Sequence, residues 1–154
     1  MAFTAETDIK APINFVYRQV TDFAALENYI LAAGAFVERT DNLEEDGAGM
    51  SWRIEGEVRG RRRVIDIELK DIVEEEQLGY EVRSKDMITQ REVEVISLDR
   101  TTTRLVSRID PAAQSISARL ILQSARLAQR TLEKRLRKRL NGFARTVETR
   151  YLQG

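Results

Sequence analysis

The side chains able to do chemistry in this chain of 154 residues are carboxylates, tyrosines, lysines and arginines, because the sequence has no histidine and no cysteine. Without imidazole or thiolate, Ser-His and Cys-His catalysis is excluded, and the usual ligands of zinc, haem and iron-sulfur centres are missing. We therefore expect no metal and no cofactor. Twenty-five basic residues balance twenty-five acidic ones, so no overall field attracts nucleic acid and no DNA partner is expected.

Arg91 is the polar residue with the clearest reason to contact a ligand. It shares the parity of Val93 and Val95 in an alternating segment, which points it toward the expected core, and no neighbouring acid of that segment and parity neutralises it. A buried arginine must meet a carboxylate, water at a cavity mouth or an anionic ligand. Its planar fork suits a carboxylate, a phosphate or a polarised carbonyl. Arg63, which shares the parity of Ile67, is a second candidate of this kind.

Acid-base catalysis would need a carboxylate or a tyrosine in a suitable place. Four carboxylates of the alternating segments take the outward parity, typical of solvated charges: Asp66, Glu68, Glu92 and Glu94. No catalytic pair is marked, so the catalytic residues stay unknown and we expect a binding protein rather than an enzyme. A cyclase- or dehydratase-like reaction without metal is the alternative, because it needs little more than a shaped pocket and a polar anchor such as Arg91 or Tyr80.

Short alternating segments separated by turn residues predict seven strands, antiparallel because parallel pairs need long crossovers. The expected strands are residues 3–10, 35–40, 50–58, 65–70, 77–84, 87–98 and 103–109. The sixth changes phase at Ile96 and Leu98, which suggests a bulge, and Asp110-Pro111 is expected to end the seventh. Two short helices should follow the first strand, one beginning near Pro12 and one capped by Asp22.

The C-terminal quarter favours one long helix. From Ser115 or Ser117 to Leu152 there is no proline and a single glycine, Gly142, so a helix of roughly 35 residues and 50 Å is allowed. One stripe should face the sheet: Ala118, Leu122, Ala125, Gln129, Leu132, Leu136, Leu140, Phe143 and Val147. Small residues in the first half of this stripe would leave room between helix and sheet.

Charge is distributed unevenly along the chain. Residues 38–99 hold 18 acids against 10 basic residues, whereas residues 116–154 hold 10 basic residues against two acids. We expect these segments to lie near each other and to complement one another, with the solvated side of the tail left basic. A role for the basic helix in docking on a macromolecule is the second alternative function.

Three local strings accompany this order of elements. They are Asp8-Ile9-Lys10-Ala11-Pro12 followed by Val16-Tyr17, Val20-Thr21-Asp22-Phe23 leading to Tyr29, and Gly49 to Trp52 at the start of the third strand. Over essentially its whole length the sequence resembles the START-like (SRPBCC) superfamily, which includes polyketide cyclase/dehydrase-like and coenzyme Q binding proteins. The resemblance implies an α+β helix-grip fold, in which a curved seven-stranded antiparallel sheet wraps around a long C-terminal helix.

The resemblance also implies a hydrophobic ligand, such as a lipid, a quinone or a polyketide-like compound, held between the sheet and the long helix. Inward parity and the helix stripe select the residues that would line this site: Trp52, Ile54, Ile67, Tyr80, Val82, Arg91, Val93, Leu122, Ala125 and Gln129. The same residues would also form a closed core if no cavity existed.

The remaining expectations concern organisation and partners. Residues 1–154 should form one domain. The N-terminus lacks a signal-peptide pattern, so a cytoplasmic location is expected, with membrane contact at most transient. Ile116, Leu120 and Leu127 lie opposite the main stripe of the helix, where they are either covered by loops or used in an interface, for example in a homodimer through Leu120 and Leu127.

Overall fold

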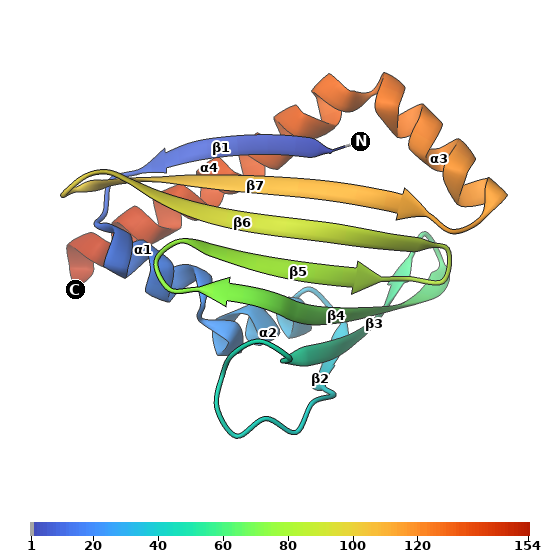
Figure 1. Cartoon of the computed structure of the whole chain (residues 1–154), viewed down its shortest axis with the longest axis horizontal. Coiled ribbons are helices and arrows are strands. Elements are labelled where there is room, and N and C mark those ends of the chain that lie inside the picture. The colour runs from blue at the N-terminus through green and yellow to red at the C-terminus, as the bar shows by residue number, and fades with distance from the viewer. Residues whose placement is uncertain (1) are drawn as a thin grey trace.

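A seven-stranded antiparallel sheet bends around a long C-terminal helix in the computed structural model, which describes residues 2–154 (Figure 1). The strands are β1 (Phe3–Ile9), β2 (Phe36–Arg39), β3 (Ser51–Val58), β4 (Arg61–Val73), β5 (Gln77–Arg83), β6 (Met87–Asp99) and β7 (Thr102–Ala113). The helices are α1 (Ile13–Val20), α2 (Phe23–Ala32), α3 (Ile116–Leu127) and α4 (Gln129–Gln153). The strand order β1-β7-β6-β5-β4-β3-β2 confirms the predicted antiparallel α+β helix-grip architecture.

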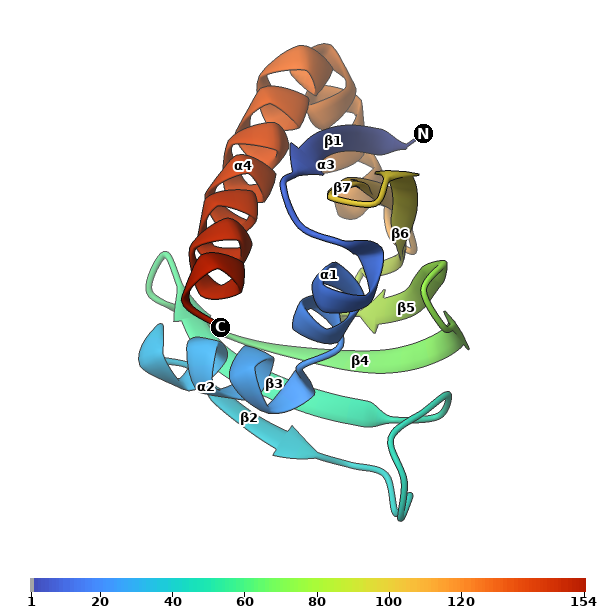
Figure 2. The same cartoon turned by 90° about the vertical axis from the view of Figure 1, so that its left-hand side faces the viewer.

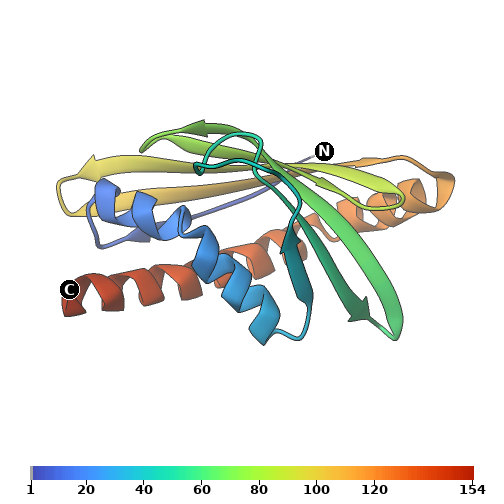
Figure 3. The ribbon, with the colours of Figure 1, turned by 90° about the horizontal axis from the view of Figure 1, so that it is seen from below.

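The N-terminal elements follow from local sequence. Alternate residues of β1 are buried from Phe3 to Ile9, and β1 pairs with β7 to close one edge of the sheet. Pro12 precedes α1, and the Asp22 carboxylate accepts the Ala25 N–H at 3.0 Å as the N-cap of α2. Figure 3 shows that the helices α1, α2 and α4 all lie on one side of the sheet.

Two apolar clusters fill the bend of the sheet. The first joins β1, β6 and β7 to α1 and α4, and includes Ile9, Val16, Leu140, Ala144 and Val147. The second joins α2 to β3, β4 and β5, and consists of Phe23, Met50, Trp52, Leu69 and Leu78. Figure 2 shows α4 lying over β1, and α2 near β2 and β3 on the other arm of the bend. The inner face of the sheet is thus sealed at two places rather than continuously.

The expectation of one continuous C-terminal helix is wrong. The chain bends at Ala128, which caps both α3 and α4 and has φ −100° and ψ 18°. α3 packs against β7, whereas α4 packs chiefly against β1 (Figure 1). Nothing in the local sequence requires the break, since Ala128 is a good helix former. Because of the bend, α3 packs on β7 and α4 packs on β1. This tertiary packing outweighs the helix propensity of the local sequence, which would allow one continuous helix.

One expectation for β6 and β7 is confirmed and another is wrong. The bulge predicted near Leu98 is present, because the register of β6 shifts between Ser97 and Asp99, although Ile96 and Leu98 stay exposed. β7 continues through Pro111, which pairs with Thr89. The β1 ladder ends at the Phe3–Ile109 pair, so Pro111 sits where β7 has a neighbour on one side only, and its missing N–H costs no ladder bond.

The expected complementarity between the acidic middle and the basic tail is not observed in residues 2–154. Ion pairs of the sheet join neighbouring strands or nearby residues, as in Arg53–Asp66 at 3.0 Å and Arg83–Glu81 at 3.0 Å. In the tail, Arg145 pairs with Glu148 of its own helix. The basic helices therefore keep a positive surface. No helix in the described part of the chain is both long and apolar enough to cross a membrane.

Two buried hydroxyls of β7 differ in their hydrogen bonding, which gives a stability prediction. Thr103 Oγ1 donates to the Ala11 carbonyl at 2.8 Å, whereas Ser107 Oγ has no partner within residues 2–154. A buried polar atom without a partner costs about 1–3 kcal/mol. We expect Ser107→Ala to leave the free energy of unfolding unchanged or to raise it, and Thr103→Ala to lower it by about 1–3 kcal/mol. Urea unfolding monitored by circular dichroism measures both, and equal losses would contradict the assignment.

Candidate ligand-binding face of the sheet

The inner face of the sheet brings most of the predicted strand residues together in two rows. In one row Leu69, Tyr80, Arg91 and Ile109 stand side by side on β4, β5, β6 and β7. In the next row toward the β5–β6 turn stand Trp52, Ile67, Val82 and Thr89. Ile54 and Ile65 form a further pair on β3 and β4. Because partners across a ladder point to the same side, these side chains share one surface.

Water reaches much of this surface. Ile54, Ile67, Val82 and Ile109 are only half-buried, although Leu69 and Trp52 between them are fully buried. The reason is the placement of α4, which packs chiefly against β1, so that β3, β4 and β5 are covered only locally, by Phe23 of α2. Half-buried apolar side chains facing a concave side are a surface that an apolar ligand can cover with a gain in free energy.

Arg91 is the charged group of this surface. Arg91 is exposed to water by surface area, yet desolvation by the surrounding protein lowers its pKa; Tyr80 acts against this lowering, and the positive charge of Arg139 on α4 adds to it. Arg91 is therefore accessible to water and at the same time partly desolvated by the residues around it. No carboxylate is bonded to Arg91 among the residues that the structure describes. Arg91 stays protonated, since arginine does not lose its charge in proteins.

Tyr80 stands directly opposite Arg91 on β5. Desolvation by the surrounding side chains raises the pKa of Tyr80 to about 12, against a smaller lowering by Arg91 and a further raise from Tyr17. The phenol is therefore a neutral hydrogen-bond donor at physiological pH. Together, Tyr80 and Arg91 offer donors to an oxygen placed between them.

The raised pKa of Tyr80 gives a measurable titration. In the unfolded chain a phenol loses its proton near pH 10, whereas folded Tyr80 loses it near pH 12. Its contribution to stability is therefore complete below about pH 10 and is lost as the pH rises through about 12. Tyrosinate absorbance of the wild type should show a late step that Tyr80→Phe makes smaller, while the late contribution of Tyr17, whose pKa is also raised by burial, remains. An unchanged late step in Tyr80→Phe would contradict the assignment.

Trp52 belongs more to the core than to the open surface. Its ring lies 5.7 Å from that of Phe23, its Nε1–H donates to Glu27 at 2.9 Å, and the Arg39 guanidinium lies 5.5 Å from the ring centroid. Only 4% of Trp52 is exposed. Among the predicted lining residues, Trp52 is therefore a buried side chain held in place by its neighbours. Val93 is half-buried and packs against both apolar clusters.

The predicted helix residues lie apart from this part of the sheet. Leu122 and Ala125 are half-buried on α3, which packs against β7 and α4. Gln129 Nε2 donates to the Ala2 carbonyl at 3.3 Å. The bend at Ala128 turns α3 away from the long axis of α4, so these residues lie beside β7 rather than over β3, β4 and β5.

Sequence reasoning missed Arg139 as a neighbour of Arg91. Arg139 is one of the basic residues of the C-terminal tail, and its charge acts on Arg91. Arg139 lies three residues after Leu136 and one before Leu140, both on the predicted stripe. A residue beside the apolar stripe borders the buried side of an amphipathic helix, and this position was the available signal.

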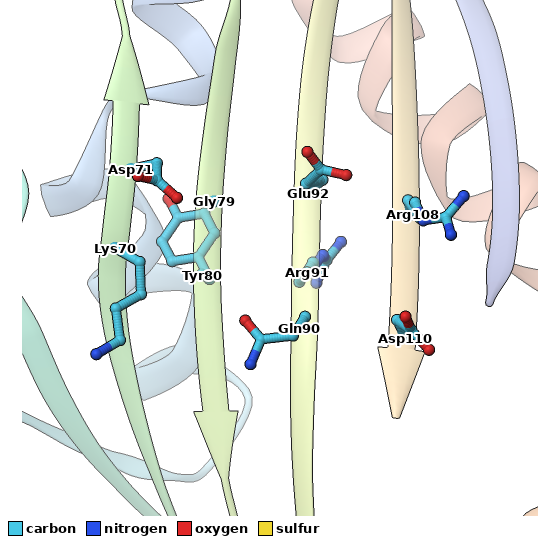
Figure 4. Close-up of a pocket in the computed structure, with 9 residues that line it drawn as sticks. All are labelled: Lys70, Asp71, Gly79, Tyr80, Gln90, Arg91, Glu92, Arg108 and Asp110. Atoms are coloured by element: carbon cyan, nitrogen blue, oxygen red, sulfur yellow. The ribbon is translucent and has the colours of Figure 1, made fainter. Parts of the chain in front are cut away.

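A hollow of about 230 Å³ opens on the outer face of the sheet (Figure 4). Most of its lining is charged or polar, and it shares Tyr80 and Arg91 with the inner row: Lys70, Asp71, Gly79, Tyr80, Gln90, Arg91, Glu92, Arg108 and Asp110. Glu92 and Arg108 are opposed across β6 and β7, one position on from the inward row of Arg91. This mixed-charge lining does not suit an apolar ligand, so the inner face remains the candidate site.

Comparisons with known proteins agree with this architecture. No protein-family model matches the sequence, and no curated protein matches it. The Zhui aromatase/cyclase from Streptomyces sp. R1128 superposes with a TM-score of 0.69 at 15% identity, covering 97% of this chain and 94% of that one. A START superfamily protein from Mycobacterium smegmatis gives 0.59 at 15%, covering 92% and 98%.

A third structure carries ligands. Norcoclaurine synthase from Thalictrum flavum, in complex with dopamine and hydroxybenzaldehyde, gives a TM-score of 0.60 at 12% identity, covering 86% of this chain and 83% of that one. At these identities the similarity is one of fold. This chain has the helix-grip fold that these structures share.

Proposed function

We propose that this protein binds an apolar small molecule carrying an acidic or strongly polarised oxygen, on the inner face of its sheet. The observation that carries the proposal is Arg91: a guanidinium with no bonded carboxylate within residues 2–154, set among half-buried apolar side chains. A few polar groups on an apolar concave surface are the usual form of a small-molecule site.

The chemistry of the surface narrows the ligand class. The apolar body would lie over Ile54, Ile67 and Val82, while its oxygens would face Arg91 and Tyr80. Arg139 adds a second positive charge near the same place. A lipid with a carboxylate, a quinone or a polyketide-like acid meets this description, whereas a cation would be repelled.

Native mass spectrometry of the protein purified from its own host tests the proposal directly. We expect a bound apolar mass that is released by organic solvent. As a second measurement, the anionic fluorophore 1-anilino-8-naphthalenesulfonate should bind the wild-type protein and be displaced by a fatty acid. Absence of any bound mass together with failure to bind the fluorophore would contradict the proposal.

A cyclase- or dehydratase-like reaction is the second candidate, and the placement of Tyr80 opposite Arg91 favours it. A neutral phenol beside a guanidinium is suited to polarise a carbonyl group. The Zhui structure is named as an aromatase/cyclase, which agrees with this candidate at the level of fold. Turnover of a polyketide-like substrate that falls strongly in Tyr80→Phe, while substrate binding persists, would favour catalysis over binding alone.

A further inference from the structure

α3 carries an apolar ridge that nothing in the described chain covers. Ile116, Leu120 and Leu127 have 79%, 58% and 93% of their surface exposed. Spacings of four and seven residues place them on one side of the helix. The opposite side, with buried Ala118, packs against β7 and α4. The fold has therefore buried one face of α3 and left a second apolar face in water.

The charge around this ridge has a single sign. Residues 111–132 contain no aspartate and no glutamate. Arg119 and Arg130 are exposed within or beside α3. An apolar ridge whose own segment carries only positive charges has the composition of a helix that lies in the interface of a membrane with anionic lipids.

We propose that α3 docks this protein on an anionic lipid surface. Leu120 and Leu127 would enter the boundary between headgroups and acyl chains, while Arg119 and Arg130 would contact lipid phosphates. The proposal concerns the outer side of α3 and does not depend on the ligand class assigned above.

Other occupants fit the ridge less well. A second copy would bring two sets of arginines together without an intervening acid, and three exposed side chains fall far short of the roughly 800 Å² per partner of a stable specific interface. A nucleic acid would satisfy the arginines but would leave the leucines at the centre of the patch against phosphates. A lipid surface satisfies both the apolar and the charged parts.

Vesicle flotation with the full-length protein tests the proposal. We expect binding to vesicles of phosphatidylcholine mixed with phosphatidylglycerol, weak binding to phosphatidylcholine alone, and weaker binding as salt is raised. The double variant Leu120→Ser/Leu127→Ser should lower the partition coefficient about tenfold or more, because two apolar side chains no longer enter the bilayer. Arg119→Glu/Arg130→Glu should remove the preference for anionic vesicles.

Leu152→Ser is the matched control, since Leu152 is 85% exposed at the C-terminus, at the opposite end of the molecule from α3 (Figures 1 and 3). It should bind vesicles as the wild type does. The proposal is overturned if the wild type fails to float with anionic vesicles or if Leu120→Ser/Leu127→Ser floats equally well. It is also overturned if sedimentation shows a stable wild-type dimer that this double variant dissociates, because the ridge would then belong to a second copy.

Discussion

Replacing Arg91 by methionine is expected to weaken binding of 1-anilino-8-naphthalenesulfonate by about ten- to a hundredfold, which corresponds to about 1.5–3 kcal/mol for a hydrogen bond to a charged group. The sulfonate of this probe offers the guanidinium an anionic partner, and its aromatic rings fit the half-buried apolar surface around Tyr80 and Val82. The fold should survive, because the methionine chain replaces the arginine stem and no ion pair is broken.

Two controls separate an anchoring role from a loss of structure. The neutral probe N-phenyl-1-naphthylamine, which has similar rings and no sulfonate, should bind Arg91→Met as well as it binds the wild type. Arg108→Met removes a guanidinium from the outer face, where Arg108 opposes Glu92, and should leave both probes unaffected. Equal affinity of wild type and Arg91→Met for the anionic probe would show that Arg91 does not anchor the ligand.

Leu69→Ala is expected to lower the free energy of unfolding by about 2–5 kcal/mol, the usual cost of truncating a buried leucine. Leu69 is fully buried in the cluster that joins α2 to β3, β4 and β5. Its loss leaves a cavity beneath Phe23 and Trp52, which neighbouring side chains fill only in part because Trp52 is held by Glu27.

Val64 on the same strand gives the comparison. Val64 is 42% exposed, so Val64→Ala should change stability by only about 0.5 kcal/mol or less. Urea denaturation followed by the fluorescence of the single tryptophan measures both variants. Similar losses for Leu69→Ala and Val64→Ala would mean that the second apolar cluster is not a core, and the whole inner face would then have to be regarded as open.

The open character of the inner face links these two experiments. The protein closes its fold with two apolar clusters that meet at Val20 and Val93, and neighbouring apolar side chains of the inner face stay in partial contact with water. A fully packed core would be more stable but could hold no ligand. Binding should therefore raise the melting temperature, since a ligand that binds only the folded state stabilises it by mass action.

Much of the local structure could be read from the sequence by itself. Alternation from Phe3 to Ile9 predicted a strand with one buried face, Asp22 predicted the cap of α2, and the parity of Arg91 with Val93 agrees with their common side of β6. The lack of histidine and cysteine removed whole classes of chemistry. These features depend on side-chain type and on backbone geometry over a few residues, which pattern reasoning captures.

Tertiary structure alone decided the features that depend on contacts between distant segments. The bend at Ala128 separates α3 from α4 because each packs on a different strand, although the sequence between Ser115 and Leu152 permits one helix. Ion pairs such as Arg53–Asp66 and Arg83–Glu81 lie within the sheet rather than between the sheet and the basic tail. Whether Arg91 would meet a carboxylate, and whether α4 would cover β3–β5, depended on how far the sheet bends and where α4 docks. The periodicity of apolar residues predicts which side of a helix or strand is buried. It does not predict which element packs against that side, because many arrangements bury the same residues equally well.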